Sequence, residues 1–392
     1  MLKKAVKKFL SVVLATAMVV SSITVYGASV KVPEDRVLTS VKEYSIAPGI
    51  KEKHITTVDK DGNNQVQAYM AEIDLKTSSV GMMAGYKNYD KTGKWGMQTV
   101  RDQAKAAEKA TGKTIVAAIN GDYFDMGTGQ PWGSLVMGGD IVQTQNDHPY
   151  FAIMKDGTAD CREAYEPLDD VVEAIGSPFF LVKDGKALEE LAADPYAMPR
   201  CAVGIKADGS VIIYEADGRQ APKSCGQSLY ETAKQMEAMG CVEALYLDGG
   251  GSATFATKTE GTDSLEVKNS PSDGTERKVS SSLFIYSDAK ADGEFDHATI
   301  SPLEEVYTPG STVQFEATGV DSAGGKADLP KEATFVLKDD SFGKIDGTTG
   351  QFVSNGTEGT VEVQLKSGDN VVGSTTIEVR KPDSITFVND EV

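Results

Sequence analysis

Residues 35–287 show short apolar runs interrupted by turn residues. Four segments place two such runs on either side of a glycine-containing turn: "SLVMGGDIVQ", "FAIMKDGTA", "FFLVKDGKAL" and "CAVGIKADGSVIIYEADGR". This pattern is typical of β-hairpins, because glycine adopts the positive φ angles that tight hairpin turns require. The pattern therefore predicts antiparallel strand pairs through most of this part of the chain.

Two segments between the hairpins have helical periodicity instead. In "QTVRDQAKAAEKATG" one apolar face is followed by a glycine (Val100, Ala104, Ala107, Gly112). The segment "SLYETAKQMEAMG" begins with the spacing of a capping box and also ends at a glycine (Ser228, Glu231, Gly240), with Leu229, Ala233 and Met236 as its apolar stripe. Serine caps and glycine stops mark helix ends, so both segments are predicted helices.

The two helical segments and the apolar strands that follow them can be aligned without gaps. The alignment places Gly112 on Gly240, Asn120 on Asp248 and Gly121 on Gly249. Each unit then has a helix, a glycine stop, a strand and a polar residue followed by glycine. An internal repeat and a chance likeness both explain the match, but either predicts an oxygen-bearing side chain at each strand end, where ligands commonly bind.

The C-terminal part has a different pattern. After a polar stretch, with a linker predicted at 288–298, residues 299–381 contain short alternating segments such as "STVQFEATGVD", "GTVEVQLKSGD" and "STTIEVRKP". Strands at this spacing predict a small all-β sandwich, followed by a tail at 382–392. Through "GKIDGTTGQFVSNGTEGTVEVQL" this part resembles bacterial Ig-like modules of group 2.

Residues 1–28 have the charged, apolar and small-residue order of a signal peptide. The apolar part is shorter than the roughly 20 residues of a membrane span, so we expect a secreted or cell-surface bacterial protein, with an uncleaved anchor as the alternative. The formal net charge is −19 and becomes −23 without the four leader lysines. Such a surface disfavours nucleic-acid binding, and an anionic ligand would have to be held locally.

The spacing of the cysteines and histidines limits which disulfides, metal sites and catalytic triads the chain can form. The four cysteines (161, 201, 225, 241) could form two disulfides or remain free thiols. Geometry argues against a Cys225–Cys241 pair, because the predicted helix between them separates its ends by roughly 20 Å, whereas a disulfide needs α-carbons within about 7 Å. No CxxC occurs, which argues against a zinc site. The histidines (54, 148, 297) lie in no motif with a serine or cysteine, which argues against a Ser-His-Asp triad. His148 could still lie at the rim of a ligand pocket.

Candidate catalytic and binding residues fall into three clusters. "AAINGDYFD" has Asn120 and Asp122 after an apolar strand, "MPRCAVGI" and "EADGR" supply Arg200 and Arg219, and "ALYLDGGGSATFA" supplies Asp248 and the loop 249–252. The glycines allow close approach of a ligand, and consecutive amides can form an anion-binding concavity. The aspartate would repel a phosphate but would stabilise or attack a sugar cation. A flexible loop and surface charges are the alternatives.

At these residues the sequence resembles the phosphodiester glycosidase family over about residues 65–287. The motifs are "AAINGDYFD", "GQPWGSLVMGGDIV", "PRCAVGIKADGSVIIYEADGR" and "SLYETAKQMEAMGCVEALYLDGGGSATF". The resemblance implies an α+β domain with a mixed, mostly antiparallel sheet and packed helices. The residues on family motif positions are Asn120, Gly121, Arg200, Asp248, Gly249, Gly250, Gly251 and Ser252. Asp122 occupies a position where the family often has another residue, so its role is less secure.

The resemblance also implies a hydrolase that cuts the glycosidic C–O bond of a sugar-1-phosphodiester, with an N-acetylglucosamine-like sugar. The hypothesis assigns phosphate to Arg200 and the 249–252 amides, the anomeric carbon to Asp248, and substrate orientation to Asn120 and Arg219. Asp122 would be the second carboxylate, or would share a divalent ion with Asp248. The alternatives are a metal-assisted phosphodiesterase that cuts P–O and a non-catalytic glycan-binding protein. The expected partner is a carbohydrate phosphodiester or a cell-envelope polysaccharide.

Overall fold

The computed structural model describes residues 30–144, 147–303 and 305–382. The predicted signal peptide lies outside these residues, as does nearly all of the predicted tail. Contacts divide the chain into two units: unit 1 is Met1–Tyr44, Gly49–Thr257 and Val267–Tyr286, and unit 2 is Ser45–Pro48, Lys258–Glu266 and Ser287–Val392. Each unit has its own apolar core.

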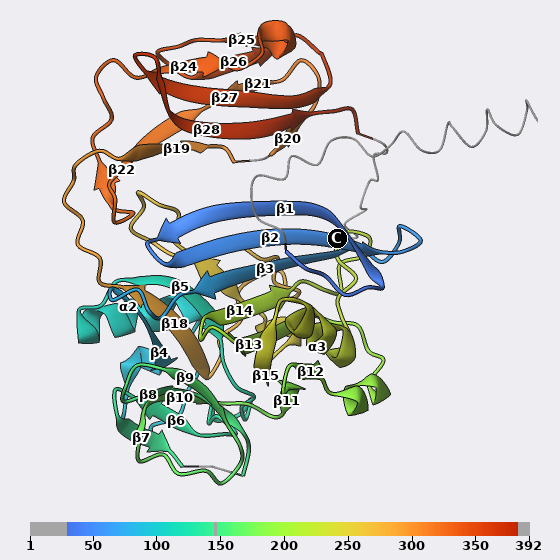
Figure 1. Ribbon diagram of the computed structural model, residues 1–392, viewed down its shortest axis with the longest axis vertical. Helices are drawn as coiled ribbons and strands as arrows, with labels where there is room; N and C mark the ends of the chain where they lie inside the picture. Colours follow the sequence, from blue (N-terminus) through green and yellow to red (C-terminus); the bar gives the residue numbers. More distant parts are fainter. Residues whose placement is uncertain (1–29, 145–146, 304, 383–392) are drawn as a thin grey trace, which may run out of the picture. The chain divides into compact units, whose positions relative to one another are not determined.

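Unit 1 is built on three sheets (Figure 1). The largest has eight strands in the order β1 (Arg36–Ala47), β2 (Ile50–Asp59), β3 (Val66–Ile73), β14 (Val211–Ala216), β13 (Arg200–Lys206), β15 (Cys241–Leu247), β11 (Phe180–Lys183) and β12 (Lys186–Ala187). Its pairs from β2 through β3, β14, β13, β15 and β11 to β12 are antiparallel.

The two other sheets of unit 1 have five strands each. One has the order β7 (Asp140–Gln143), β6 (Leu135–Met137), β10 (Val171–Gly176), β8 (Tyr150–Met154) and β9 (Ala159–Arg162). The other has the order β17 (Glu266–Val267), β16 (Phe255–Thr257), β5 (Ile115–Asn120), β18 (Ser281–Ser287) and β4 (Val80–Tyr86). Every residue of β5 is buried, as expected for an apolar strand between two others.

All four predicted hairpins are present, as β6–β7, β8–β9, β11–β12 and β13–β14. The turns contain glycines at positive φ, such as Gly185 (φ 72°) and Gly209 (φ 86°), which is the physical reason that the turn residues predicted them.

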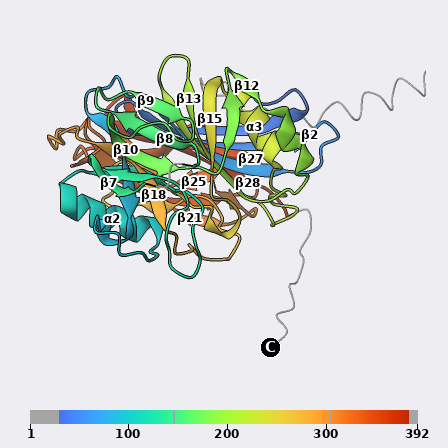
Figure 2. The ribbon, with the colours of Figure 1, turned by 90° about the horizontal axis from the view of Figure 1, so that it is seen from below.

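Both predicted helices are present, as α2 (Val100–Thr111) and α3 (Leu229–Ala238). Gly112 ends α2 at φ 72°, and the Ser228–Glu231 capping box opens α3 with both of its hydrogen bonds formed. Leu229, Ala233 and Met236 of α3 pack in one core cluster with the large sheet. Figures 1 and 2 show the two helices on opposite sides of unit 1.

The fold class needs one correction. Unit 1 is mostly antiparallel β structure, and α2 and α3 are the only α-helices among the described residues; the short 3₁₀ helices are η1 (Lys87–Tyr89), η2 (Glu189–Ala193), η3 (Gly250–Ser252) and, in unit 2, η4 (Asp340–Phe342). The expectation of an α+β domain with packed helices overstated the helical share, because α2 and α3 contain only 12 and 10 residues and most of the other regular structure of unit 1 consists of strands. Neither helix is long and apolar enough to span a bilayer, and the same holds throughout the described ranges.

Unit 2 is all-β apart from η4. Its sheets are β19 (His297–Ser301), β22 (Glu316–Val320) and β23 (Lys326–Ala327); β20 (Val306–Tyr307), β28 (Asn370–Val379), β27 (Gly359–Ser367) and β24 (Thr334–Leu337); and β21 (Thr312–Gln314), β26 (Gln351–Ser354) and β25 (Gly343–Ile345). Phe315 and Phe352 lie in its core. Because β19 begins at His297, the end of the predicted linker is part of a strand. The Ig-like assignment stays a prediction.

Candidate active site

Two strand ends from different sheets meet at the predicted site. β5 ends at Asn120 and β15 at Leu247, and the Asp248 N–H donates to the Gly121 carbonyl oxygen at 2.8 Å. The Asn120 Nδ2 donates to the Asp248 carbonyl oxygen at 2.6 Å. The positions that the sequence alignment matched, Asn120 with Asp248 and Gly121 with Gly249, are therefore neighbours in space.

Asn120 connects the two strand ends rather than facing a substrate. Its side chain is fully buried, and its Oδ1 accepts the Thr254 N–H at 2.9 Å and lies 3.3 Å from Cys201 Sγ. Both polar atoms of the amide are thus used within the protein. In this arrangement the side chain positions the loop that carries Asp248, whereas the sequence hypothesis assigned Asn120 to the orientation of substrate.

Asp122 is a deeply buried carboxyl group, 3% exposed. Its Oδ2 accepts the Gly133 N–H at 2.6 Å, whereas its Oδ1 is buried without a hydrogen-bond partner. Burial raises the pKa of Asp122 to about 7; the N–H groups of Gly133 and Tyr123 oppose the shift, and the charge of Asp248 adds to it. The group can therefore gain or lose a proton near neutral pH.

Asp248 is less deeply buried than Asp122. Burial raises its pKa to about 6, against the opposing effects of the Ser252 hydroxyl, Arg277 and the Gly249 N–H. Burial thus raises the pKa of both carboxyl groups, and it is the main cause at each.

Polar side chains pack closely against the glycines of the loop 249–252. A Cβ on Gly249 would come within 2.4 Å of Tyr246 Oη, and one on Gly251 within 2.0 Å of an Arg277 nitrogen. Gly250 has φ 61°, a conformation that favours glycine. The glycines therefore allow the backbone to contact these polar groups closely.

The predicted four-amide anion site is not formed. The Gly250 N–H donates to the Pro199 carbonyl at 2.9 Å, and the Ser252 N–H to the Gly249 carbonyl at 3.2 Å. The Gly249 N–H interacts with the Asp248 carboxylate. Among the described residues, Gly251 is the one member of the loop whose N–H has no partner, because the Pro199 carbonyl, the Gly249 carbonyl and the Asp248 side chain accept the other three.

Arg200 does not have the predicted position of a phosphate ligand. It is 2% exposed, and its guanidinium donates to the Gln227 carbonyl (2.9 Å), the Tyr246 hydroxyl (3.1 Å) and the Tyr196 carbonyl (2.6 Å). The sequence identified a motif residue, but its side chain is turned into the protein, where it holds Tyr246 in place.

Two other arginines flank the glycine loop. Arg219 is exposed, and its guanidinium lies beside Gly250, 3.2 Å from where a Cβ would be. Arg277, which sequence reasoning missed, packs on Gly251, bonds Asp273 at 2.8 Å and reaches Ser252 Oγ at 3.4 Å. Arg277 lies in the polar stretch "SPSDGTERK", where no motif marks it.

The sequence analysis also raised a shared metal ion and disulfide bonds. No group of three or more His, Cys, Asp or Glu side chains in the described residues is arranged to hold a metal ion. Asp122 and Asp248 alone supply fewer ligands than the roughly six that Mg²⁺ or Ca²⁺ takes, so no step is derived through a metal. All four cysteines are free thiols.

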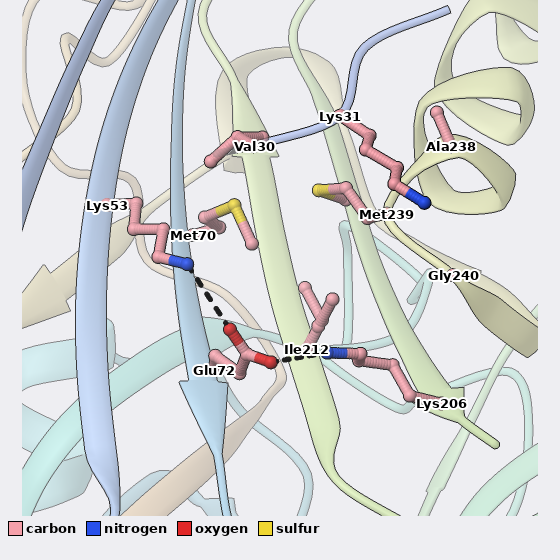
Figure 3. A pocket seen from close by; sticks show the side chains of 10 residues that line it. All are labelled: Val30, Lys31, Lys53, Met70, Glu72, Lys206, Ile212, Ala238, Met239 and Gly240. Carbon is pink, nitrogen blue, oxygen red and sulfur yellow. Dashed lines mark hydrogen bonds and ion pairs between the residues drawn. The ribbon is translucent and has the colours of Figure 1, made fainter. Parts of the chain in front are cut away.

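A cavity of about 320 Å³ lies elsewhere on the large sheet (Figure 3). Lys53 and Lys206 both bond Glu72 there, and residues of the segment 238–240 form part of the wall. None of the predicted site residues lines this cavity.

Fold and site together define a mostly antiparallel β domain with two carboxyl groups of raised pKa beside two arginines. This combination is suited to a hydrolase whose substrate has both an electrophilic carbon and an anionic group. Residues 113–286 match the family model described as phosphodiester glycosidase, so this part of the chain is similar to that family. All the predicted site residues, and Arg277, lie within the matched range.

Individual relatives agree with this family. Mouse N-acetylglucosamine-1-phosphodiester alpha-N-acetylglucosaminidase is 29% identical over 161 residues, which is 35% of this chain and 31% of that protein. The SPbeta prophage-derived uncharacterized protein YomE of Bacillus subtilis is 39% identical over 98 residues, 25% of this chain and 14% of its own. The matches thus span about a third of these relatives or less. A hypothetical protein from Synechocystis has a similar fold (TM-score 0.50, 14% identity, 63% of this chain and 64% of that one).

Proposed function

We propose that this domain hydrolyses a sugar-1-phosphodiester at its glycosidic C–O bond, releasing the sugar and a phosphate monoester. The observation that carries the proposal is the pair of carboxyl groups, Asp122 and Asp248, with pKa values raised to about 7 and about 6 at joined strand ends. The family model and the names of the relatives support the same reaction class.

Asp248 is the residue that we assign to the anomeric carbon. Its carboxylate would stabilise or attack the positive charge that develops there as the C–O bond breaks. The departing phosphate monoester has a second pKa near 6, so it needs little protonation. Asp122 would act as the acid/base group that takes a proton from the attacking water, since its pKa is matched to neutral pH.

We assign the phosphate to Arg219, Arg277 and the Gly251 N–H. Guanidinium groups bind phosphate oxygens through paired hydrogen bonds, and these two flank the glycine loop next to Asp248. Arg200 is a positioning residue in this scheme, because its donors are used inside the protein.

Arg219→Met and Arg277→Met should each raise KM for a sugar phosphodiester about tenfold, because each removes one charged phosphate contact, worth roughly 1.5–3 kcal/mol. Steady-state kinetics would measure this. Arg101→Met is the matched control, since Arg101 pairs with Glu276 rather than facing the loop. Unchanged KM in both variants would contradict the phosphate assignment.

The pH profile of kcat should rise through two limbs, near pH 6 and near pH 7, and stay level above them. The lower limb arises because Asp248 must be ionised to stabilise the sugar cation, and the upper limb because Asp122 must be ionised to take a proton from the attacking water. The two groups interact, so the limbs belong to the pair. In Asp122→Asn the limb near pH 7 should disappear and the limb near pH 6 should remain; a profile with both limbs intact would remove Asp122 from the mechanism.

Hydrolysis in ¹⁸O-labelled water tests the bond that is cut. With methyl N-acetyl-α-glucosaminyl phosphate as substrate, label in the released sugar is expected. Label in the phosphate would instead indicate a phosphodiesterase, and a parallel reaction with a chelator would test its metal dependence. No turnover of this or other sugar phosphodiesters would favour a glycan-binding protein.

The finer parts of the proposal concern substrate and location. An N-acetylglucosamine-like sugar is proposed from the names of the relatives, and secretion from the leader pattern of residues 1–28. A carbohydrate phosphodiester of the cell envelope would be within reach of such a protein.

A further inference from the structure

Trp132 is a large apolar side chain that remains 49% exposed beside the candidate carboxyl groups. Its backbone is fixed on both sides: the Trp132 N–H donates to the Tyr123 carbonyl at 2.9 Å, and the next N–H, of Gly133, donates to Asp122 Oδ2 at 2.6 Å. The same short segment thus anchors Asp122 and presents an indole ring to solvent.

Trp132 is the outermost member of a row of aromatic rings. Its ring lies 5.4 Å from the Tyr123 ring at an interplanar angle of 84°, and Tyr123 lies 6.0 Å from Tyr246 at the same angle. Tyr246 stacks on Phe179 at 5.1 Å and 4°. The row therefore runs from the surface to the buried tyrosine whose hydroxyl lies against Gly249.

This row also approaches the reacting groups. Tyr123 is close enough to Asp248 and Asp122 for their charges to raise its pKa together with burial, which is the larger cause. The His148 ring lies 6.4 Å from the Trp132 ring at an interplanar angle of 23°. Packing by Tyr123 and His148 limits the freedom of the indole, so little conformational entropy is lost when a ligand contacts it.

We propose that Trp132, supported by Tyr123, is the surface on which the pyranose ring of the substrate stacks. The C–H face of a pyranose is apolar and carries partial positive charge, which complements the negative face of an aromatic ring. A ring placed there lies next to the carboxyl groups at the two strand ends. This inference rests on the proposed function and adds a sugar-binding residue to it.

Intrinsic fluorescence provides a test that does not depend on turnover. The chain has two tryptophans, and Trp95→Phe leaves Trp132 as the single indole. Titration of this variant with N-acetylglucosamine should shift the Trp132 emission to shorter wavelength, because the sugar displaces water from the ring. An emission spectrum unchanged at saturating sugar would overturn the inference.

Kinetics provide the second readout. Trp132→Ala should raise KM for methyl N-acetyl-α-glucosaminyl phosphate about tenfold, equivalent to about 1.4 kcal/mol, with kcat within about threefold. Trp132→Phe should recover part of the loss. Tyr165→Ala, which removes a more exposed aromatic ring (72%), should behave as wild type. A wild-type KM in Trp132→Ala, with turnover present, contradicts the inference alone. Absent turnover with an intact emission shift contradicts the proposed hydrolysis alone.

Discussion

Asp248→Asn is expected to lower kcat about 10³-fold, within the range for loss of one catalytic group, while KM changes by less than about threefold. The amide keeps the shape of the side chain but cannot supply the negative charge that the sugar cation requires. Steady-state kinetics on a sugar phosphodiester would measure both parameters.

The folded state should tolerate this substitution. Folding raises the pKa of Asp248 to about 6, so the ionised form is disfavoured in the folded protein, and this penalty is fully present above pH 6. A neutral amide removes it, and Tm at pH 7.5 should be equal or higher. Asp125→Asn is the matched control, because Asp125 accepts the Gly127 and Thr128 N–H groups in an exposed loop. A kcat within tenfold of wild type in Asp248→Asn would exclude the assigned role.

Asn120→Ala is expected to lower the free energy of unfolding by about 3 kcal/mol, because it leaves the buried Thr254 N–H and the Asp248 carbonyl without their partners, at ~1–3 kcal/mol each. Denaturant titration would measure the loss, and Tm should fall by roughly 6–12 °C. Activity should fall as well, since the loop that carries Asp248 loses its anchor.

Asn63→Ala provides the comparison for a stability effect. The Asn63 side chain is exposed and only its backbone is hydrogen-bonded, so this variant should lie within about 0.5 kcal/mol of wild type. If Asn120→Ala were equally stable but inactive, Asn120 would contact substrate, as the sequence suggested, and our assignment of a positioning role would be wrong.

The elements of the fold were predictable where local chemistry decides the local structure. Hairpins followed from glycine turns between apolar runs, and both helices from a stop glycine and, in α3, the Ser228–Glu231 capping box. The order of the strands in each sheet did not follow from the sequence, because tertiary pairing joins segments that are distant in the chain. The pairing of β13 with β15, which brings Arg200 near Asp248, is of this kind.

The sequence also identified the site at the level of segments. Aligning "ATGKTIVAAINGD" with "AMGCVEALYLDGG" placed Asn120 and Asp248 at equivalent strand ends, and these ends are in contact. The sequence pattern does not show, however, whether the Arg200 side chain points into the protein or toward a ligand. Carbonyl oxygens in the interior and phosphate oxygens of a ligand can both accept hydrogen bonds from a guanidinium group. The sequence therefore could not decide between a structural and a ligand-binding role for Arg200, nor for Asn120.

By itself the sequence determined the four hairpins, both helices with their ends and the glycine turns, and it marked Asp122, Asp248 and the loop 249–252 as candidate chemical groups. These properties depend on residue type and close spacing, which the chain carries locally. Tertiary structure alone decided which arginines flank the loop, which amides are already bonded, and how far burial raises the two carboxyl pKa values. Such properties depend on groups distant in sequence, as Arg277 is from Gly251, and on the loss of water that only folding brings about.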